Sequence, residues 1–141
     1  MAEIVGRCHC GNLSFDLQTK IPLQQLPIRA CTCSFCKAHG AKCTSDPDGQ
    51  LRIIVHEDRS VIRYQFGKKT ADFLLCGKCG CYLDAILHEG DKSWSTVNLR
   101  LTAFSEIAAE PVSYDEEAVG SRIKRRKARW TPVIQFRKGE A

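Results

Sequence analysis

The sequence predicts a mainly β protein with one helix near its C-terminus. Short segments in which apolar and polar residues alternate recur along most of the chain, and turn-forming Gly, Pro and Asp residues separate them. One segment close to the C-terminus instead repeats its apolar residues at about the helical period. With 141 residues, 43% hydrophobic and 26% charged, the chain has the size and composition of an ordinary globular domain. We therefore expect residues 1–141 to form a single domain.

The strands are expected in the following order. Leu13, Phe15 and Leu17 alternate with polar residues, as in a strand that buries one face. Residues 45–49 form a strong turn signal, S-D-P-D-G, and a second strand is expected directly after it, at residues 51–55. Further strands are expected at residues 62–66, 71–75, 82–87 and 94–101.

The predicted helix runs from about Asp115 to Arg129. Ser113 and Glu116 have the spacing of a capping box, which favours a helix start at this point. Pro132 is expected to end the helix, since proline cannot continue it. The apolar face that should pack on the sheet consists of Val119, Ile123 and Trp130.

Charge and hydropathy exclude several classes of protein. No apolar run approaches the roughly 18 residues of a membrane span, and the N-terminus lacks the layout of a signal peptide, so we expect a cytoplasmic protein that does not enter a membrane. The net charge of +5 favours anionic partners only weakly. Basic residues are concentrated at 124–127 and Arg129. We interpret them as a solvated helix face rather than a nucleic-acid site, because no recognised nucleic-acid-binding module accompanies them.

The nine cysteines are the strongest functional signal. Seven of them fall into three tight groups, which are Cys8/Cys10, Cys31/Cys33/Cys36 and Cys76/Cys79. Closely spaced thiols in a reducing compartment are typical of metal ligands, whereas a disulfide framework is the weaker alternative. Cys43 and Cys81 stand outside the groups and are expected to be small buried residues.

The seven grouped thiols divide most simply into two zinc sites. The two pairs, Cys8/Cys10 and Cys76/Cys79, supply the four ligands of a structural site, and both pairs are followed by glycine, as a tight metal-binding turn requires. The C-x-C-x-x-C triple at 31–36 then keeps one coordination position open, which is the catalytic arrangement. A different partition, in which part of the triple joins Cys76/Cys79, stays open, and Cys81 could complete either site.

A zinc ion with three thiolate ligands has a net charge of −1. Because thiolates donate electrons strongly, such a centre is poorly suited to making hydroxide and better suited to holding an added thiol as a nucleophilic thiolate. The expected chemistry is therefore addition of sulfur to an electrophile. His39 follows the triple and is a candidate fourth ligand or general base. Candidate partners for substrate carboxylates, among which spacing does not decide, are Arg7, Lys37, Lys42 and Arg100.

These motifs resemble the glutathione-dependent formaldehyde-activating enzyme family, also called the centromere protein V domain family. The resemblance rests on residues 6–11 (G-R-C-H-C-G), 31–36 (C-T-C-S-F-C) and 73–80 (F-L-L-C-G-K-C-G), and it spans most of the chain. It implies a β-tent fold of short antiparallel strands and a structural zinc at Cys8, Cys10, Cys76 and Cys79. It also implies a catalytic zinc at Cys31, Cys33 and Cys36.

The family's activity is formation of S-hydroxymethylglutathione from glutathione and formaldehyde, a carbon–sulfur lyase reaction in the reverse sense. The resemblance thus implies a small-molecule thiol such as glutathione and an aldehyde as partners. The alternative hypothesis is a non-catalytic binding module, in which both zinc ions are structural and the basic helix contacts an acidic partner. A fourth protein ligand at the second zinc, from His39 or Cys43, would favour that alternative.

Overall fold

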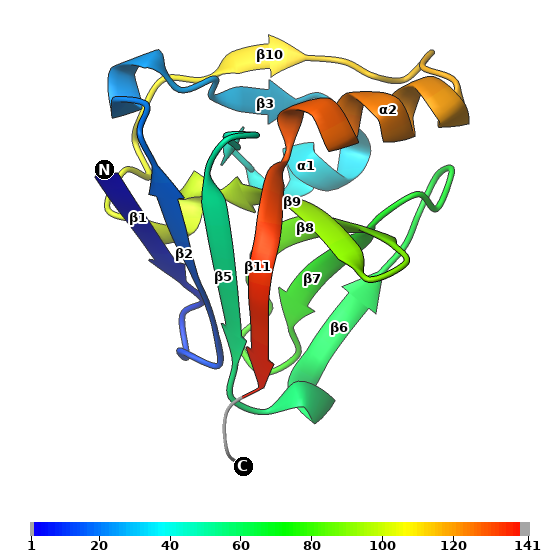
Figure 1. Ribbon diagram of the computed structural model, residues 1–141. Coiled ribbons are helices and arrows are strands. Elements are labelled where there is room, and N and C mark those ends of the chain that lie inside the picture. Colours follow the sequence, from blue (N-terminus) through cyan, green and yellow to red (C-terminus); the bar gives the residue numbers. More distant parts are fainter. Residues whose placement is uncertain (1, 139–141) are drawn as a thin grey trace.

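The computed structural model describes residues 2–138 and is mainly β with a helix near the C-terminus, which confirms the predicted fold class (Figure 1). The strands are β1 (Ala2–Arg7), β2 (Leu13–Thr19), β3 (Arg29–Cys31), β4 (Cys43–Thr44), β5 (Gln50–Val55), β6 (Val61–Tyr64), β7 (Asp72–Cys76), β8 (Tyr82–Glu89), β9 (Lys92–Asn98), β10 (Glu110–Val112) and β11 (Thr131–Lys138). The α-helices are α1 (Ser34–His39) and α2 (Val119–Arg129), and short 3-10 turns lie at η1 (Leu23–Gln25), η2 (Asp58–Ser60) and η3 (Leu99–Leu101). None of the helices in the described part of the chain is long and apolar enough to span a bilayer.

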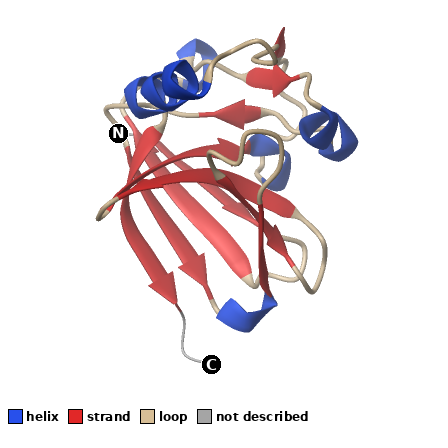
Figure 2. Ribbon diagram, turned by 90° about the vertical axis from the view of Figure 1, so that its right-hand side faces the viewer, coloured by secondary structure: helices blue, strands red, loops and turns tan. Residues whose placement is uncertain are grey.

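Two groups of strands converge towards one end of the molecule and separate towards the other (Figures 1 and 2). The first group has the order β1-β2-β5-β11, and the second is the antiparallel series β9-β8-β7-β6. They are joined where the first residues of β11 pair with β9, at Thr131 and Pro132. On the same edge β9 also pairs with β4, which leads on to β3 and β10. The α-helices α1 and α2 lie at the wide end, above the strands, whereas the short 3-10 turn η2 lies at the narrow end (Figures 1 and 2).

The sequence had led us to expect antiparallel strands, but two of the strand pairs in the described chain are parallel. β11 runs parallel to β5, and β10 runs parallel to β3. The reason for the first pairing is visible in Figure 1, where α2 carries the chain across the wide end before β11 descends alongside β5. Parallel neighbours need such a crossover connection, whereas a tight hairpin gives only antiparallel ones.

The core lies between the two groups of strands and follows the predicted alternation. Phe15 and Leu17 of β2 are paired with Ile53 and Leu51 of β5, and all four side chains are buried. The second group of strands contributes buried apolar side chains to the same core, among them Leu74, Leu83, Ile86 and Val97. Leu99, in the η3 turn after β9, also belongs to this core. Adjacent strands thus present their apolar faces to one interior, which holds the cysteine-bearing turns at the strand ends in place.

The helix differs from its prediction at its start. α2 begins at Val119, its N-cap is Ala118, and no side chain caps it. The expected capping box is wrong because the Ser113 hydroxyl accepts from the backbone N–H of Asp115, and Glu117 instead pairs with two arginines of the helix.

The apolar face of the helix was predicted correctly only in part. Trp130 is buried and Ile123 packs beside it, whereas Val119 is exposed. The helix ends at Arg129, as expected, but Pro132 lies inside β11 and pairs with β9.

Other differences concern short or interrupted elements. β3 and β4 have three and two residues, too few to show a period. Residues 99–101, expected as the end of a strand, form the 3-10 turn η3, and Phe66 lies beyond the end of β6. β1 buries only Ile4 and Gly6, so its alternation in sequence is faint.

Candidate metal centres

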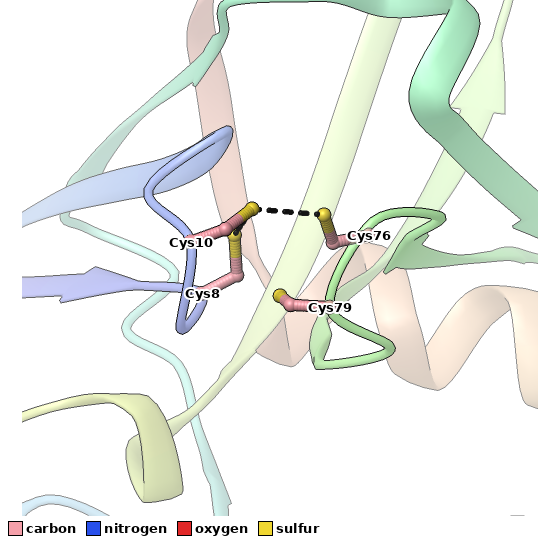
Figure 3. Close-up of side chains that lie close together, drawn as sticks. All are labelled: Cys8, Cys10, Cys76 and Cys79. Carbon is pink, nitrogen blue, oxygen red and sulfur yellow. Dashed lines mark hydrogen bonds between the residues drawn. The ribbon is translucent and has the colours of Figure 1, made fainter.

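Four cysteine sulfurs converge at the narrow end of the molecule (Figure 3). Cys8 and Cys10 lie in the turn after β1, Cys76 ends β7, and Cys79 lies in the turn before β8. All four Sγ atoms lie within 4.8 Å of one another, with 3.7 Å between Cys8 and Cys10 and 3.5 Å between Cys10 and Cys76. Four sulfurs about 2.3 Å from one tetrahedral metal ion would be about 3.8 Å apart. This group could therefore hold a metal ion.

Two glycine-containing turns set this geometry. Gly11 and Gly80 each follow a cysteine pair and have positive φ angles of 85° and 80°, which L side chains rarely adopt. The Cys8 turn is closed by a bond from the Cys8 N–H to the Leu13 carbonyl, and the Leu13 N–H points back at Cys8 Sγ, 3.3 Å away. Backbone amides directed at sulfur stabilise the thiolate form that a metal requires.

The second group, Cys31, Cys33 and Cys36, lies at the opposite, wide end of the fold. Cys31 ends β3, Cys33 is the N-cap of α1, and Cys36 lies in the first turn of that helix. The Cys33 sulfur accepts a hydrogen bond from the Cys36 N–H at 3.4 Å. The three sulfurs lie within 4.8 Å of one another. A hydrogen bond from the Cys36 thiol lowers the pKa of Cys31 to about 6.

The structure separates the seven cysteines as the sequence spacing had predicted. The two pairs form one group, the triple forms the other, and the mixed partition of the triple with Cys76/Cys79 is not observed. Within residues 2–138 no other His, Cys, Asp or Glu joins either group. Cys43 is buried, as expected, and burial raises its pKa to about 12. Cys81 is only half-buried, and its backbone carbonyl closes the turn around Cys76.

His39 is not part of the three-cysteine group. Its Nδ1 lies 2.9 Å from the Phe35 carbonyl oxygen, and its ring packs 4.4 Å from the Phe35 ring. It lies at the far end of α1 from Cys33 and does not line the cavity beside the triple.

A cavity of about 90 Å³ lies directly against the three cysteines. Part of the lining is aromatic and apolar, and consists of Phe66, Phe73, Tyr82, Ala85 and Trp130. The lining is also strongly basic, and its arginines are Arg29, Arg122, Arg125 and Arg126. The acid in the lining is Asp115, which is exposed. The three-cysteine group therefore faces a small, positively charged space.

The four arginines differ in how they are paired. Arg125 makes a two-pronged contact with Glu117 and stacks over the Tyr114 ring at 3.6 Å, and Arg122 lies 3.5 Å from Glu117. Arg126 is 6% exposed, and it donates one hydrogen bond, to Thr70, and packs on Trp130. Arg29 bonds to the Ser45 hydroxyl. Neither Arg126 nor Arg29 has an ion pair with a carboxylate of residues 2–138.

Burial shifts the pKa values of two side chains, Arg126 on α2 and Asp84 on β8. Burial lowers the pKa of Arg126 to about 10, so its guanidinium stays charged at neutral pH. On β8, burial raises the pKa of Asp84 to about 7, and a hydrogen bond from Ser95 at 2.7 Å offsets this only in part.

The cations that the sequence suggested as carboxylate partners lie elsewhere. Arg7 packs over Gly11, Lys42 bonds to the carbonyls of Ser105 and Ile107, and Arg100 bonds to that of Gly40. These three residues and Lys37 are absent from the cavity lining.

Two of the cavity arginines, Arg125 and Arg126, come instead from the basic run that we had interpreted as a solvated face. The spacing of residues along the helix could have identified Arg126 as a residue of the buried face. It lies four residues before Trp130 and so shares the helix face expected to be buried.

Comparison with models of known protein families gives no match, and comparison with curated protein sequences gives none either. Among solved structures, the crystal structure of a Rhodobacter sphaeroides protein is similar to this chain, with a TM-score of 0.53 and 24% sequence identity. The match covers 77% of this chain and 99% of that one. At this identity the similarity concerns the fold alone.

Proposed function

We propose that the protein is a zinc-dependent enzyme that forms or cleaves adducts between a thiol and a carbonyl compound, a carbon–sulfur lyase. The observation that carries this proposal is the three-cysteine group that faces a cavity. The sequence motifs support it through their resemblance to the glutathione-dependent formaldehyde-activating enzyme family. In this proposal the four-cysteine group is a structural zinc site, and the three-cysteine group is the catalytic one.

The donor set favours zinc among the metals that such sites take. Tetrahedral sites made of thiolates alone select zinc or iron–sulfur clusters, and the sulfur separations of the first group suit a single ion. At Cys31, Cys33 and Cys36, three protein ligands leave a position for a fourth. A zinc ion bound there would hold the sulfur of a small-molecule thiol as a nucleophilic thiolate.

The surrounding residues prepare the cavity for this reaction. Phe66, Phe73 and Trp130 give the cavity apolar surface, which would leave a bound thiolate poorly solvated and therefore reactive. Cys33 is fixed by its hydrogen bond from the Cys36 N–H, and Cys31 by its place at the end of β3. The arginines add a positive potential that favours the anionic form of the thiol.

The proposed reaction is balanced without an oxidant or reductant. A bond forms between the thiol sulfur and the carbonyl carbon, and the carbonyl double bond becomes a single bond. The proton that leaves the thiol is matched by the proton that the carbonyl oxygen takes up to become a hydroxyl. The reverse reaction releases the aldehyde and the free thiol.

The alternative of a non-catalytic binding module receives less support from the structure. That hypothesis would be favoured by a fourth protein ligand at the triple. In the described chain, His39 bonds to the Phe35 carbonyl oxygen instead, and Cys43 is not part of the group.

The proposal is tested by exchange between thiol adduct and free aldehyde. Zinc-loaded protein should accelerate the exchange of hydroxymethylglutathione with formaldehyde and glutathione, measured by NMR above the uncatalysed rate. Cys36→Ser should abolish the acceleration, whereas Cys81→Ser, a cysteine outside both groups, should retain it. Equal rates with and without the wild-type protein, for this aldehyde and for larger ones, would contradict the proposal.

A further inference from the structure

Two buried or half-buried guanidinium groups in the cavity lack an anionic partner. Arg126 and Arg29 both line the cavity, and neither is within ion-pair distance of a carboxylate in the part of the chain that the structure describes. Buried charges in proteins are as a rule paired or bound to a metal, since an unpaired buried charge is costly. A ligand that brings a negative charge into the cavity would supply the missing partner.

The unused hydrogen-bond donors of Arg126 also favour an anionic ligand in the cavity. A guanidinium has five N–H donors, and within residues 2–138 Arg126 donates one hydrogen bond, to Thr70 Oγ1 at 2.7 Å. Packing against Trp130, with the guanidinium carbon 4.8 Å from the ring centroid, holds the group against the cavity wall. A planar guanidinium held in this way matches the two oxygens of a carboxylate.

The neighbouring arginines do not compete for this role. Arg122 and Arg125 share Glu117, so their charge is already partly neutralised within the helix and the turn before it. Asp115, the acid in the cavity lining, is exposed at the surface and forms no ion pair with Arg126 or Arg29 among residues 2–138. The cavity therefore keeps an excess of positive charge beside the three cysteines.

We propose that Arg126 and Arg29 bind a carboxylate of the thiol whose sulfur is held at Cys31, Cys33 and Cys36. This inference rests on the proposed function and narrows its substrate class to thiols that carry an acidic group. The three cysteines and both arginines line the same cavity of about 90 Å³, so one ligand can bring its sulfur to the cysteines and its carboxylate to the arginines.

The test compares two thiols that differ only in charge. 3-Mercaptopropionate carries a carboxylate, and 3-mercaptopropionamide has nearly the same shape but is neutral. Binding of each to metal-loaded protein is measured by calorimetry, and by the charge-transfer absorption of the cobalt(II)-substituted protein, which reports sulfur at the metal. A hydrogen-bonded charge pair contributes enough to predict about 10- to 100-fold tighter binding of the acid than of the amide.

Substitutions of single arginines test which residue causes the tighter binding of the acid. Arg126→Gln should remove most of the preference by weakening the acid and leaving the amide unchanged. Arg129→Gln removes the same charge from an exposed position of the same helix, outside the cavity, and should keep the preference. If Arg126→Gln does not fold, as judged by circular dichroism, Arg29→Gln takes its place and should lower the preference in the same direction.

The possible outcomes separate the two proposals. Equal binding of acid and amide to the wild-type protein would overturn the carboxylate inference and leave the thiol-binding function intact. Failure of both thiols to bind would overturn the proposed function, and with it the inference that rests on it. If the preference for the acid survives in both Arg126→Gln and Arg29→Gln, these arginines do not bind the carboxylate, and the inference is overturned.

Discussion

Asp84 should make the protein less stable as the pH rises, in contrast to most aspartates. Its side chain is fully buried on β8, Oδ2 accepts a hydrogen bond from Ser95, and Oδ1 has no hydrogen-bond partner in the described part of the chain. Burial raises the pKa of Asp84 from 3.8 to about 7 in the folded state. Because the folded value exceeds the unfolded one, the folded state holds this proton more tightly. The stabilisation is complete below about pH 4 and is lost as the pH rises to about 7.

The size of this effect follows from the pKa difference. Each pH unit between the two values costs about 1.4 kcal/mol, so the whole shift corresponds to about 4 kcal/mol. Asp84→Asn keeps the shape but does not titrate. The free energy of unfolding of the wild type relative to Asp84→Asn should therefore fall by about 1 kcal/mol per pH unit from pH 5 to 7.

The assay is urea denaturation of metal-loaded protein at a series of pH values. Protonation of the cysteine ligands at low pH affects both proteins equally, so the difference between them isolates Asp84. Asp48→Asn, at an exposed position, controls for the change in net charge. A wild-type-minus-variant difference that stays constant from pH 5 to 8 would refute the reasoning.

Three further predictions concern the helix and the metal groups. Trp130 is 5% exposed, so Trp130→Ala should lose about 3–5 kcal/mol in denaturant unfolding, whereas the exposed Lys124→Ala should change less than about 0.5 kcal/mol. Freshly purified protein supplied with zinc should contain about two zinc ions per chain by elemental analysis, because seven thiols divide into a four and a three. Cys8→Ser should unfold, since a structural zinc contributes on the order of 10 kcal/mol, whereas Cys36→Ser should stay folded by circular dichroism with about one zinc, because its ligands close almost no loop.

The strands that could be predicted are those whose alternation is strong in the sequence itself. Leu13, Phe15 and Leu17 show it directly, and β2 forms where expected. The parallel pairing of β11 with β5 could not be foreseen, because it depends on where α2 returns the chain. β11 itself was missed because Pro132 was expected to end the helix rather than to lie at the junction of two groups of strands.

The metal groups could be predicted because their geometry is largely local. A C-x-C or C-x-x-C turn with a following glycine fixes the positions of its sulfurs within a few residues, and only the pairing of the two turns needs the fold. The cavity could not be predicted in the same way. Arg29 and Arg126 come from distant parts of the chain, and they meet only because β3 and α2 both lie over the wide end of the fold.

The central claim is that the site at Cys31, Cys33 and Cys36 has a free position that takes a thiol. X-ray absorption at the zinc edge counts the sulfur ligands directly, on protein loaded with two zinc ions and measured before and after addition of a thiol. We expect seven sulfur ligands per chain without thiol, all from the grouped cysteines, and one more with it. In Cys36→Ser the addition of thiol should leave the sulfur count unchanged. A wild-type spectrum in which both zinc ions already have four protein ligands, and which thiol does not alter, would contradict the account.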